Sequence, residues 1–548
     1  METEETKQNQ TAAHAKTASV SDMTVGSPLR QITKFAMPLI LGYILQQMYL
    51  VIDAAIVGRW IGVEALAAVG ASSSIMFLVM GFCNGACAGF AIPVAQSFGA
   101  KDYSKMRLYV ANAVRISAVM ATVVTLLSLM FCHRILQMVN TPADIFHDAY
   151  IFLMLQFAAI PLTFGFNLFS GQIRALGNSR QPFYFLITSA VVNVLLDVVL
   201  ILGCGLGVAG AGIATWLSQA LSVILCLWYI RKHMQLLIPK GDERRFDNKR
   251  TSILLNNGVP MGLQFSITGI GIIMLQSANN ALGTTCVAAF TASMRIKYLF
   301  TCVFENIGVA MATYCGQNLG ARRMDRVTKG VKDAITLMLI YFVFTFALIY
   351  PFADWMMRLF VDSGEAEVVG RAAQFMRIAN YFYPALGLLT ILRYSIQGLG
   401  FSNLSMLSGV MEMIARCGVS LLLGLDLGNH LGEVGFPLAF KVPLGIEFLA
   451  ADAPLADGVG RRLLELLVQE PAGKGMALAR RLLVREGRRR DGVAFGAHRA
   501  VGIVVDVRVR IGLLLPTCIG RALGLLLDTL QHLELFLEVF VGIPTGEG

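Results

Sequence analysis

Long apolar stretches alternate with short polar segments along most of this chain. Eleven stretches, each near the roughly 20 residues that cross a bilayer core as a helix, follow one another between Phe35 and Leu423. They lie at residues 35–57, 66–95, 108–131, 146–170, 183–203, 208–230, 252–276, 285–315, 333–353, 368–392 and 403–423. The pattern predicts an all-α polytopic membrane protein. The polar leader at residues 1–33 is expected to be a disordered cytoplasmic tail.

Basic residues orient these stretches. Most of them lie in the loops after even-numbered stretches, and few lie in the loops after odd-numbered ones. Arg174 and Arg180 are counted as residues of the loop after the fourth stretch. The positive-inside rule therefore predicts that the N-terminus and the even loops are cytoplasmic. The net charge of +10 reflects this topology, so no nucleic-acid partner is needed to explain it.

The second half of the apolar region repeats the first at a nearly constant offset. The matching pairs are Pro38 with Pro260, Gln96 with Gln317, Gly99 with Gly320, and Arg174 in "RALGNSRQ" with Gln397 in "QGLGFSNL". Six spans separate each element from its copy, so both copies have the same orientation, as in carriers that alternate access between two lobes. This predicts an N-lobe at 34–232, a basic cytoplasmic linker at 233–250 and a C-lobe at 251–423. The glutamines of the repeat are expected to cap the cytoplasmic ends of their helices.

Three segments carry a family resemblance. "PLILGYILQQMYLVIDAAIVGRWIGVEALAAVG" at 38–70, "GNSRQPFYFLITSAVVNVLLDVVLI" at 177–201 and "ATYCGQNLGA" at 312–321 resemble the multidrug and toxic compound extrusion (MATE) family, closest to its bacterial NorM and DinF-like members. The resemblance implies a twelve-helix antiporter of the bacterial inner membrane. Such a protein exports cationic amphiphilic compounds in exchange for H⁺ or Na⁺, and needs no cofactor beyond that ion.

Few ionisable side chains lie inside the apolar stretches, where each costs at least about 2.5 kcal/mol. Asp53 shares a helix face with Gln46 and Tyr49, and Asp197 lies one turn beyond Asn193. Both stretches run outward, so the two carboxylates can meet in the outer half of the N-lobe. There they could share a proton or bind a hard cation through oxygen.

Two interpretations of these carboxylates are open. The resemblance implies that Asp53, Asn193 and Asp197 perform cation coupling. Alternatively, Asp53 lies at the membrane boundary and Asp197 makes a satisfied hydrogen bond in the packing.

The C-lobe does not repeat this group. The offset places Leu275, Arg416 and Ser420 at the equivalent positions, so ion coupling is expected in the N-lobe alone. Glu412 and Arg416, spaced i, i+4, are expected to form an ion pair, either structural or functional.

The substrate cavity is expected to take polar lining from both lobes. Gln46, Tyr49, Gln264 and Glu305 are the predicted lining residues, and Glu305 is a candidate for attracting a cationic substrate. The expected partners are small cationic molecules and membrane lipid, and the chain is expected to be a monomer.

Two other function classes fit the sequence less well. A flippase of lipid-linked sugars, from the same superfamily, is the alternative transporter, and it would favour a basic cavity. A membrane enzyme is disfavoured because the seven histidines lie in tails and loops without metal-ligand spacing.

The composition changes after Leu423. Residues 424–548 contain no Ser, Tyr or Trp but twelve arginines, and no long uncharged apolar run replaces the twelfth helix that the resemblance implies. We interpret this aberrant tail as an out-of-frame reading of the end of the gene. A genuine accessory domain is the alternative.

Overall fold

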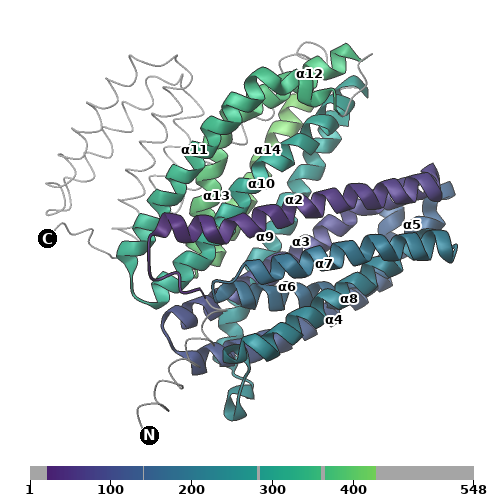
Figure 1. Cartoon of the computed structure of the whole chain (residues 1–548). Coiled ribbons are helices and arrows are strands. Elements are labelled where there is room, and N and C mark those ends of the chain that lie inside the picture. The colour runs from purple at the N-terminus through teal and green to yellow at the C-terminus, as the bar shows by residue number, and fades with distance from the viewer. Residues whose placement is uncertain (1–20, 140, 281–283, 360–364, 427–548) are drawn as a thin grey trace, which may run out of the picture. The chain divides into compact units, whose positions relative to one another are not determined.

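The computed structural model describes residues 21–139, 141–280, 284–359 and 365–426, which are helical and contain no strand (Figure 1). Apart from Tyr381–Ala385, these residues belong to one compact unit. The helices are α2 (Pro28–Trp60), α3 (Val63–Gly99), α4 (Tyr103–Met138), α5 (Ala143–Ala158), α6 (Ile160–Ala175), α7 (Arg180–Asp197), α8 (Gly207–His233), α9 (Asn248–Asn280), α10 (Thr284–Gly320), α11 (Met324–Met357), α12 (Ala366–Tyr381), α13 (Tyr383–Gly398) and α14 (Ser402–Asp426). The tail from residue 427 onward lies outside the described residues, so the hypothesis about it stays a prediction.

Each predicted apolar stretch is occupied by one helix or by a bent pair of helices. The pairs α5–α6 and α12–α13 bend by 42° and 52°, and Pro161 and Pro384 stand at the second position after each break, where proline cannot continue the preceding helix. Within the described residues, seven helices are long and apolar enough to cross a membrane, or nine if each bent pair is one span. The polytopic fold is thereby confirmed.

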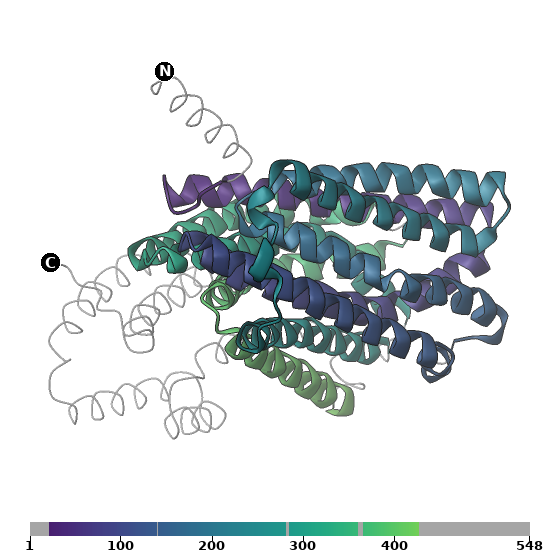
Figure 2. The same ribbon diagram turned by 90° about the horizontal axis from the view of Figure 1, so that it is seen from below.

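Two predicted spans, α9 and α14, belong to the second repeat. They pack against each other, and α9 also lies along α3 (Figure 2). The α3–α9 contact is close because Gly85 has no side chain: a Cβ there would lie 2.5 Å from the carbonyl oxygen of Met261. Small residues that allow such backbone approach are typical of helix contacts in membranes. This contact joins the first repeat to the second.

The sequence repeat is also present in the backbone. Lys101 and Arg322, which occupy equivalent positions in the two repeats, have positive φ values of 57° and 58°. Gly177 and Gly400, a second equivalent pair, have φ values of 82° and 96°. A positive φ is uncommon for a residue other than glycine. The same turn chemistry therefore ends α3 and α10, and likewise α6 and α13.

The two repeats meet through reciprocal hydrogen bonds. The Gln96 side-chain amide donates to the Gly398 carbonyl oxygen at 3.0 Å, and that of Gln317 donates to the Ala175 carbonyl oxygen at 2.8 Å. These glutamines bridge the repeats, and so the prediction that they cap the cytoplasmic ends of their own helices is wrong. The spacing placed them at helix ends but could not reveal the opposite repeat alongside. We call the region formed by residues 96–102, 174–180, 317–326 and 397–402 the closed end.

The backbones themselves touch at the closed end. A Cβ on Gly99 would lie 1.9 Å from the Gln317 carbonyl oxygen, and a Cβ on Gly320 would lie 1.9 Å from the Gln96 carbonyl oxygen. No larger residue fits either position without separating α3 from α10.

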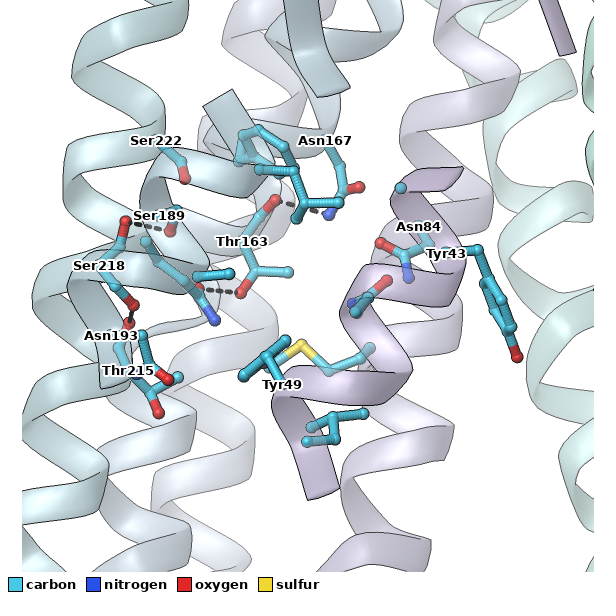
Figure 3. A pocket seen from close by; sticks show the side chains of 18 of the residues that line it. Tyr43, Tyr49, Asn84, Thr163, Asn167, Ser189, Asn193, Thr215, Ser218 and Ser222 are labelled. Atoms are coloured by element: carbon cyan, nitrogen blue, oxygen red, sulfur yellow. Dashed lines mark hydrogen bonds between the residues drawn. The ribbon is translucent and has the colours of Figure 1, made fainter. Parts of the chain in front are cut away.

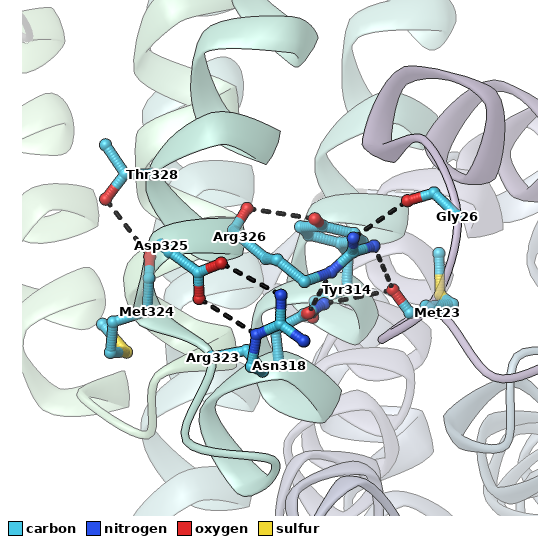
Figure 4. Close-up of polar contacts among 9 residues, drawn as sticks. All are labelled: Met23, Gly26, Tyr314, Asn318, Arg323, Met324, Asp325, Arg326 and Thr328. Carbon is cyan, nitrogen blue, oxygen red and sulfur yellow. Dashed lines mark hydrogen bonds and ion pairs between the residues drawn. The ribbon is translucent and has the colours of Figure 1, made fainter.

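The N-terminal segment 21–27 lies against both repeats, and Figure 4 shows its contacts with α10 and α11 of the second repeat. The Ser21 amide donates to the Leu176 carbonyl oxygen at 3.2 Å. Met23 is 1% exposed; its amide donates to the Gln317 side chain at 2.9 Å, and its carbonyl accepts from Arg326 at 3.1 Å. The prediction of a disordered leader is therefore wrong for residues 21–33, because this segment has ordered backbone partners and α2 begins at Pro28. Residues 1–20 lie outside the described part.

The linker at 233–250 is ordered by an ion pair to α4. It contains two short 3₁₀ helices, Gln235–Leu237 and Gly241–Arg244. Arg107 donates to the Glu243 carboxylate at 2.5 Å and 2.6 Å, and this bidentate bond lowers the pKa of Glu243 to about 2.

Gly99→Ala should destabilise the protein by about 1 to 3 kcal/mol, because the added methyl group overpacks the closed end. Thermal unfolding in detergent measures this as a fall in Tm. Gly70→Ala is the matched control on α3, since a Cβ at Gly70 meets no atom within 4 Å; it should leave Tm unchanged or raise it. Equal effects of the two changes would contradict the packing described here.

Arg107→Gln should lower stability at neutral pH but not at low pH. The folded-state pKa of Glu243 lies below the ordinary value of 4.5. The pair therefore stabilises the fold above about pH 4.5 and loses this effect as the pH falls toward 2. The Tm difference between wild type and variant, recorded from pH 7 to pH 3, should shrink below pH 4.5. Arg134→Gln, an exposed change on the same helix, should show no such trend.

Candidate functional site

A cavity of about 490 Å³ lies within the first repeat (Figure 3). Its walls come from α2, α3, α5, α6, α7 and α8, with Asn306 of α10 as a further lining residue. This volume is in the range of small-molecule sites. Of the predicted site residues, Gln46, Tyr49, Asp53 and Asn193 line the cavity.

The structure brings the predicted carboxylates together. Asp53 on α2 and Asp197 at the end of α7 lie close to each other, and Tyr49 stands beside both. Asp197 is 0% exposed and Asn193 is 3% exposed. Two carboxylates can form a hydrogen bond only if one carries a proton.

This group of oxygens lacks donors. Among the described residues, no hydrogen-bond partner reaches Asp53 Oδ1, either carboxylate oxygen of Asp197, or Asn193 Oδ1. A buried carboxylate without a partner is costly. Such a set can therefore take up a proton, or a hard cation that prefers oxygen ligands. The interpretation of Asp197 as a satisfied packing residue is not supported.

A π-helical segment follows Asp197 directly. It runs from Val198 to Gly203, and π-helical turns of this kind are frequent at functional sites. The apolar sequence of this segment carries no signal of it, and the sequence analysis predicted an uninterrupted span.

Hydroxyl and amide groups form one wall of the cavity. Thr163 donates to the Gln219 side chain at 2.7 Å and Asn167 donates to the Thr163 carbonyl at 2.9 Å, while Ser189 donates to the Ser218 carbonyl at 2.7 Å (Figure 3). The sequence analysis missed this wall. The sequence does contain a pattern that could have predicted this wall, because four polar residues follow one another at i, i+7, i+11 and i+18, a spacing that places them on one helix face. They are Gln156, Thr163, Asn167 and Arg174.

Two predicted lining residues stand outside this cavity. Gln264 is buried, and its side-chain oxygen accepts from Gln397 and Ser405 at 2.8 Å each. Glu305 accepts from the Tyr394 hydroxyl at 3.2 Å, and only its chain neighbour Asn306 reaches the cavity. Both were assigned to the lining because they are polar in apolar spans, but their partners belong to the second repeat.

The second repeat contains a buried ion pair, at positions that are not equivalent to those of the carboxylate pair. Arg393 donates to Glu412 at 2.9 Å, and the two side chains are 13% and 4% exposed. The side chains of Arg416, Leu275 and Ser420 lie outside the described ones, so the predicted Glu412–Arg416 pair stays a prediction. Within the described part of the chain, no three His, Cys, Asp or Glu side chains gather as a metal site would require.

The comparisons with known proteins agree with the repeat. The MatE family matches residues 38–199 and again 260–421. The chain is 28% identical to the Probable multidrug resistance protein YoeA of Bacillus subtilis over 428 residues, which is 76% of this chain and 91% of YoeA. It is 29% identical to the Probable multidrug resistance protein YpnP of the same organism, over 69% of this chain and 84% of YpnP.

Solved structures share the fold. One is described as the outward-facing conformation of a multidrug resistance MATE family transporter of the MOP superfamily, with a TM-score of 0.72 and 20% identity over 82% of this chain and 98% of that one. A MOP superfamily transporter from Pyrococcus furiosus, described as having a binding pocket of reverse polarity, has a TM-score of 0.73 and 19% identity over the same shares. With two family matches placed one repeat apart and this helical fold, the chain belongs to the MatE family, the multidrug and toxic compound extrusion transporters that its sequence resembles.

Proposed function

We propose that this chain is an ion-coupled antiporter that exports small cationic amphiphiles in exchange for H⁺ or Na⁺. The observation that carries the proposal is the pair formed by Asp53, which lines the cavity, and the buried Asp197, since Asp53 Oδ1 and both carboxylate oxygens of Asp197 lack donors. The similarity to YoeA and YpnP, both named probable multidrug resistance proteins, supports a cargo of drug-like molecules.

The carboxylate pair supplies a physical basis for exchange. Without an ion, two negative charges close together in a medium of low dielectric repel each other and attract cations. One proton or one Na⁺ relieves this repulsion, with Asn193 and Tyr49 supplying further oxygens for a metal cation. A cargo cation in the same cavity competes for the same negative charge. Ion entry and cargo release are then linked, because each favours the other.

Alternating access requires the closed end to open. It is held by two glutamine bridges and the close backbone approach of α3 and α10. A hydrogen bond contributes a net of about 0.5 to 1.5 kcal/mol, so breaking two of them is a small cost for a transport cycle. The cavity would then reach the other side of the membrane.

The distribution of charge supports an orientation. The closed end carries Lys101, Arg180, Arg322 and Arg323, and the positive-inside rule assigns such an end to the cytoplasm. The N-terminus then lies in the cytoplasm as well. We assign the protein to the bacterial inner membrane as a monomer, with lipid around its apolar helices.

Asp53→Asn and Asp197→Asn should each lower gradient-driven ethidium efflux about tenfold or more, since each removes a charged ligand of the coupling ion. Efflux is measured from energised vesicles under a proton gradient and then under a sodium gradient. The gradient that supports wild-type efflux names the ion. Wild-type rates in both variants would contradict the proposal.

The same variants should not lose stability. Because the Asp197 oxygens are buried without donors, a neutral amide there should leave Tm unchanged or raise it. Functional residues of this kind often lower the stability of the fold. Glu64→Gln, an exposed acid on α3, serves as the matched control and should keep full efflux. A marked fall in Tm for Asp197→Asn would show that the carboxylate is structural.

A further inference from the structure

Arg174 lies inside the helical bundle. The apolar pattern predicts a loop position for it, but the structure places it in the last turn of α6, where it lines the cavity. Its guanidinium cannot lose its charge in a protein. A permanent positive charge at this depth needs a partner.

The protein supplies no anionic partner. Among the described residues, no side chain or carbonyl accepts a hydrogen bond from Arg174, and the described ion pairs belong to other arginines. The ionisable groups that face it are the thiols of Cys226 and Cys87. A thiol is a weak acceptor and does not balance a full charge.

The end of α6 does not occupy the guanidinium either. A basic side chain near a helix C-terminus often bonds to the last carbonyl groups. Here the Ala175 carbonyl accepts from the Gln317 side chain at 2.8 Å. The two carbonyl groups before it accept from backbone amides: Arg174 from Gly177 at 2.8 Å, and Ile173 from Leu176 at 3.3 Å. None of these bonds comes from the Arg174 side chain, whose donors are thus available to the cavity.

The two ends of the cavity carry charges of opposite sign. Arg174 precedes the start of α7 by six residues, whereas Asp53 faces Asp197 at the end of α7. Arg180 and Asp197 are the first and last residues of α7, and 17 steps of helical rise place them ~26 Å apart along the axis. The guanidinium and the carboxylate pair thus lie at opposite ends of the site.

We propose that Arg174 forms an anion-binding subsite of the cavity, which takes a carboxylate, sulfate or phosphate group of the cargo. This inference rests on the proposed export function and refines its substrate class. The preferred cargo carries an acidic group as well as a cationic one, and it lies with the acidic group toward the closed end. Guanidinium groups suit such anions because they donate two parallel hydrogen bonds.

A matched pair of dyes tests the subsite. Rhodamine 6G is a cationic ester, and rhodamine 19 is the same molecule with a free carboxylate. Equilibrium binding of each is measured by fluorescence with the full chain in phosphatidylcholine nanodiscs and no ion gradient. Arg174→Gln should weaken rhodamine 19 binding about tenfold and leave rhodamine 6G binding unchanged. Arg180→Gln, an exposed change nearby, should alter neither.

A second measurement needs no variant. Benzoate added to the wild type should displace rhodamine 19 and not rhodamine 6G, so the proposal remains testable even if Arg174→Gln does not fold. Equal effects of the substitution on both dyes, or equal displacement of both by benzoate, would overturn the subsite. Because no gradient is applied, such a failure leaves ethidium export by the carboxylate pair untouched.

Lipid headgroups carry the same anionic chemistry. Binding is therefore repeated with phosphatidylglycerol in the nanodisc. If this lipid weakens rhodamine 19 binding in the wild type but not in Arg174→Gln, the subsite exists and accepts a headgroup. If binding is unaffected, the subsite takes the anionic group of a soluble cargo.

Discussion

Two glutamine side chains, one from each repeat, connect the halves of this protein. Each donates to a carbonyl group at the end of a helix in the other repeat. They can do so because Gly99 and Gly320 let α3 and α10 approach until their backbones touch. Each bond pairs a helix-end carbonyl of one repeat with a glutamine of the other, so these bonds also fix the register of the two repeats. The position of the cavity relative to the closed end follows from this contact.

The two repeats share a backbone plan but not a chemistry. Equivalent turns at Lys101 and Arg322 have nearly the same φ, whereas the buried charges differ. The first repeat has carboxylates without donors, and the second has the Arg393–Glu412 pair. A compensated pair in the second repeat suits a structural role. Under the proposed function, the uncompensated pair is the group that exchanges ions.

Much of the fold could be predicted from the sequence, because membrane helices must be long, apolar and separated by polar turns. The meeting of Asp53 and Asp197 was also predictable, since both helices run in the same direction and place these residues at similar depth. The position of Arg174 in the cavity was not predictable, because the predicted span ended at residue 170 whereas the helix continues to Ala175. The contacts of Gln264 and Glu305 were missed for a different reason: polarity in a span signals burial, but it does not identify the partner.

The central claim is that the cavity reaches the side of the closed end only when the two repeats separate there. The test uses Ala100→Cys and Ala321→Cys in a background without the ten native cysteines. These changes place one thiol on each repeat beside the Gly320 contact, since a Cβ on Gly320 would lie 2.9 Å from the Ala100 nitrogen. A short, reducible thiol cross-linker should stop ethidium efflux, and reduction should restore it. Undiminished efflux from fully cross-linked protein would contradict the account.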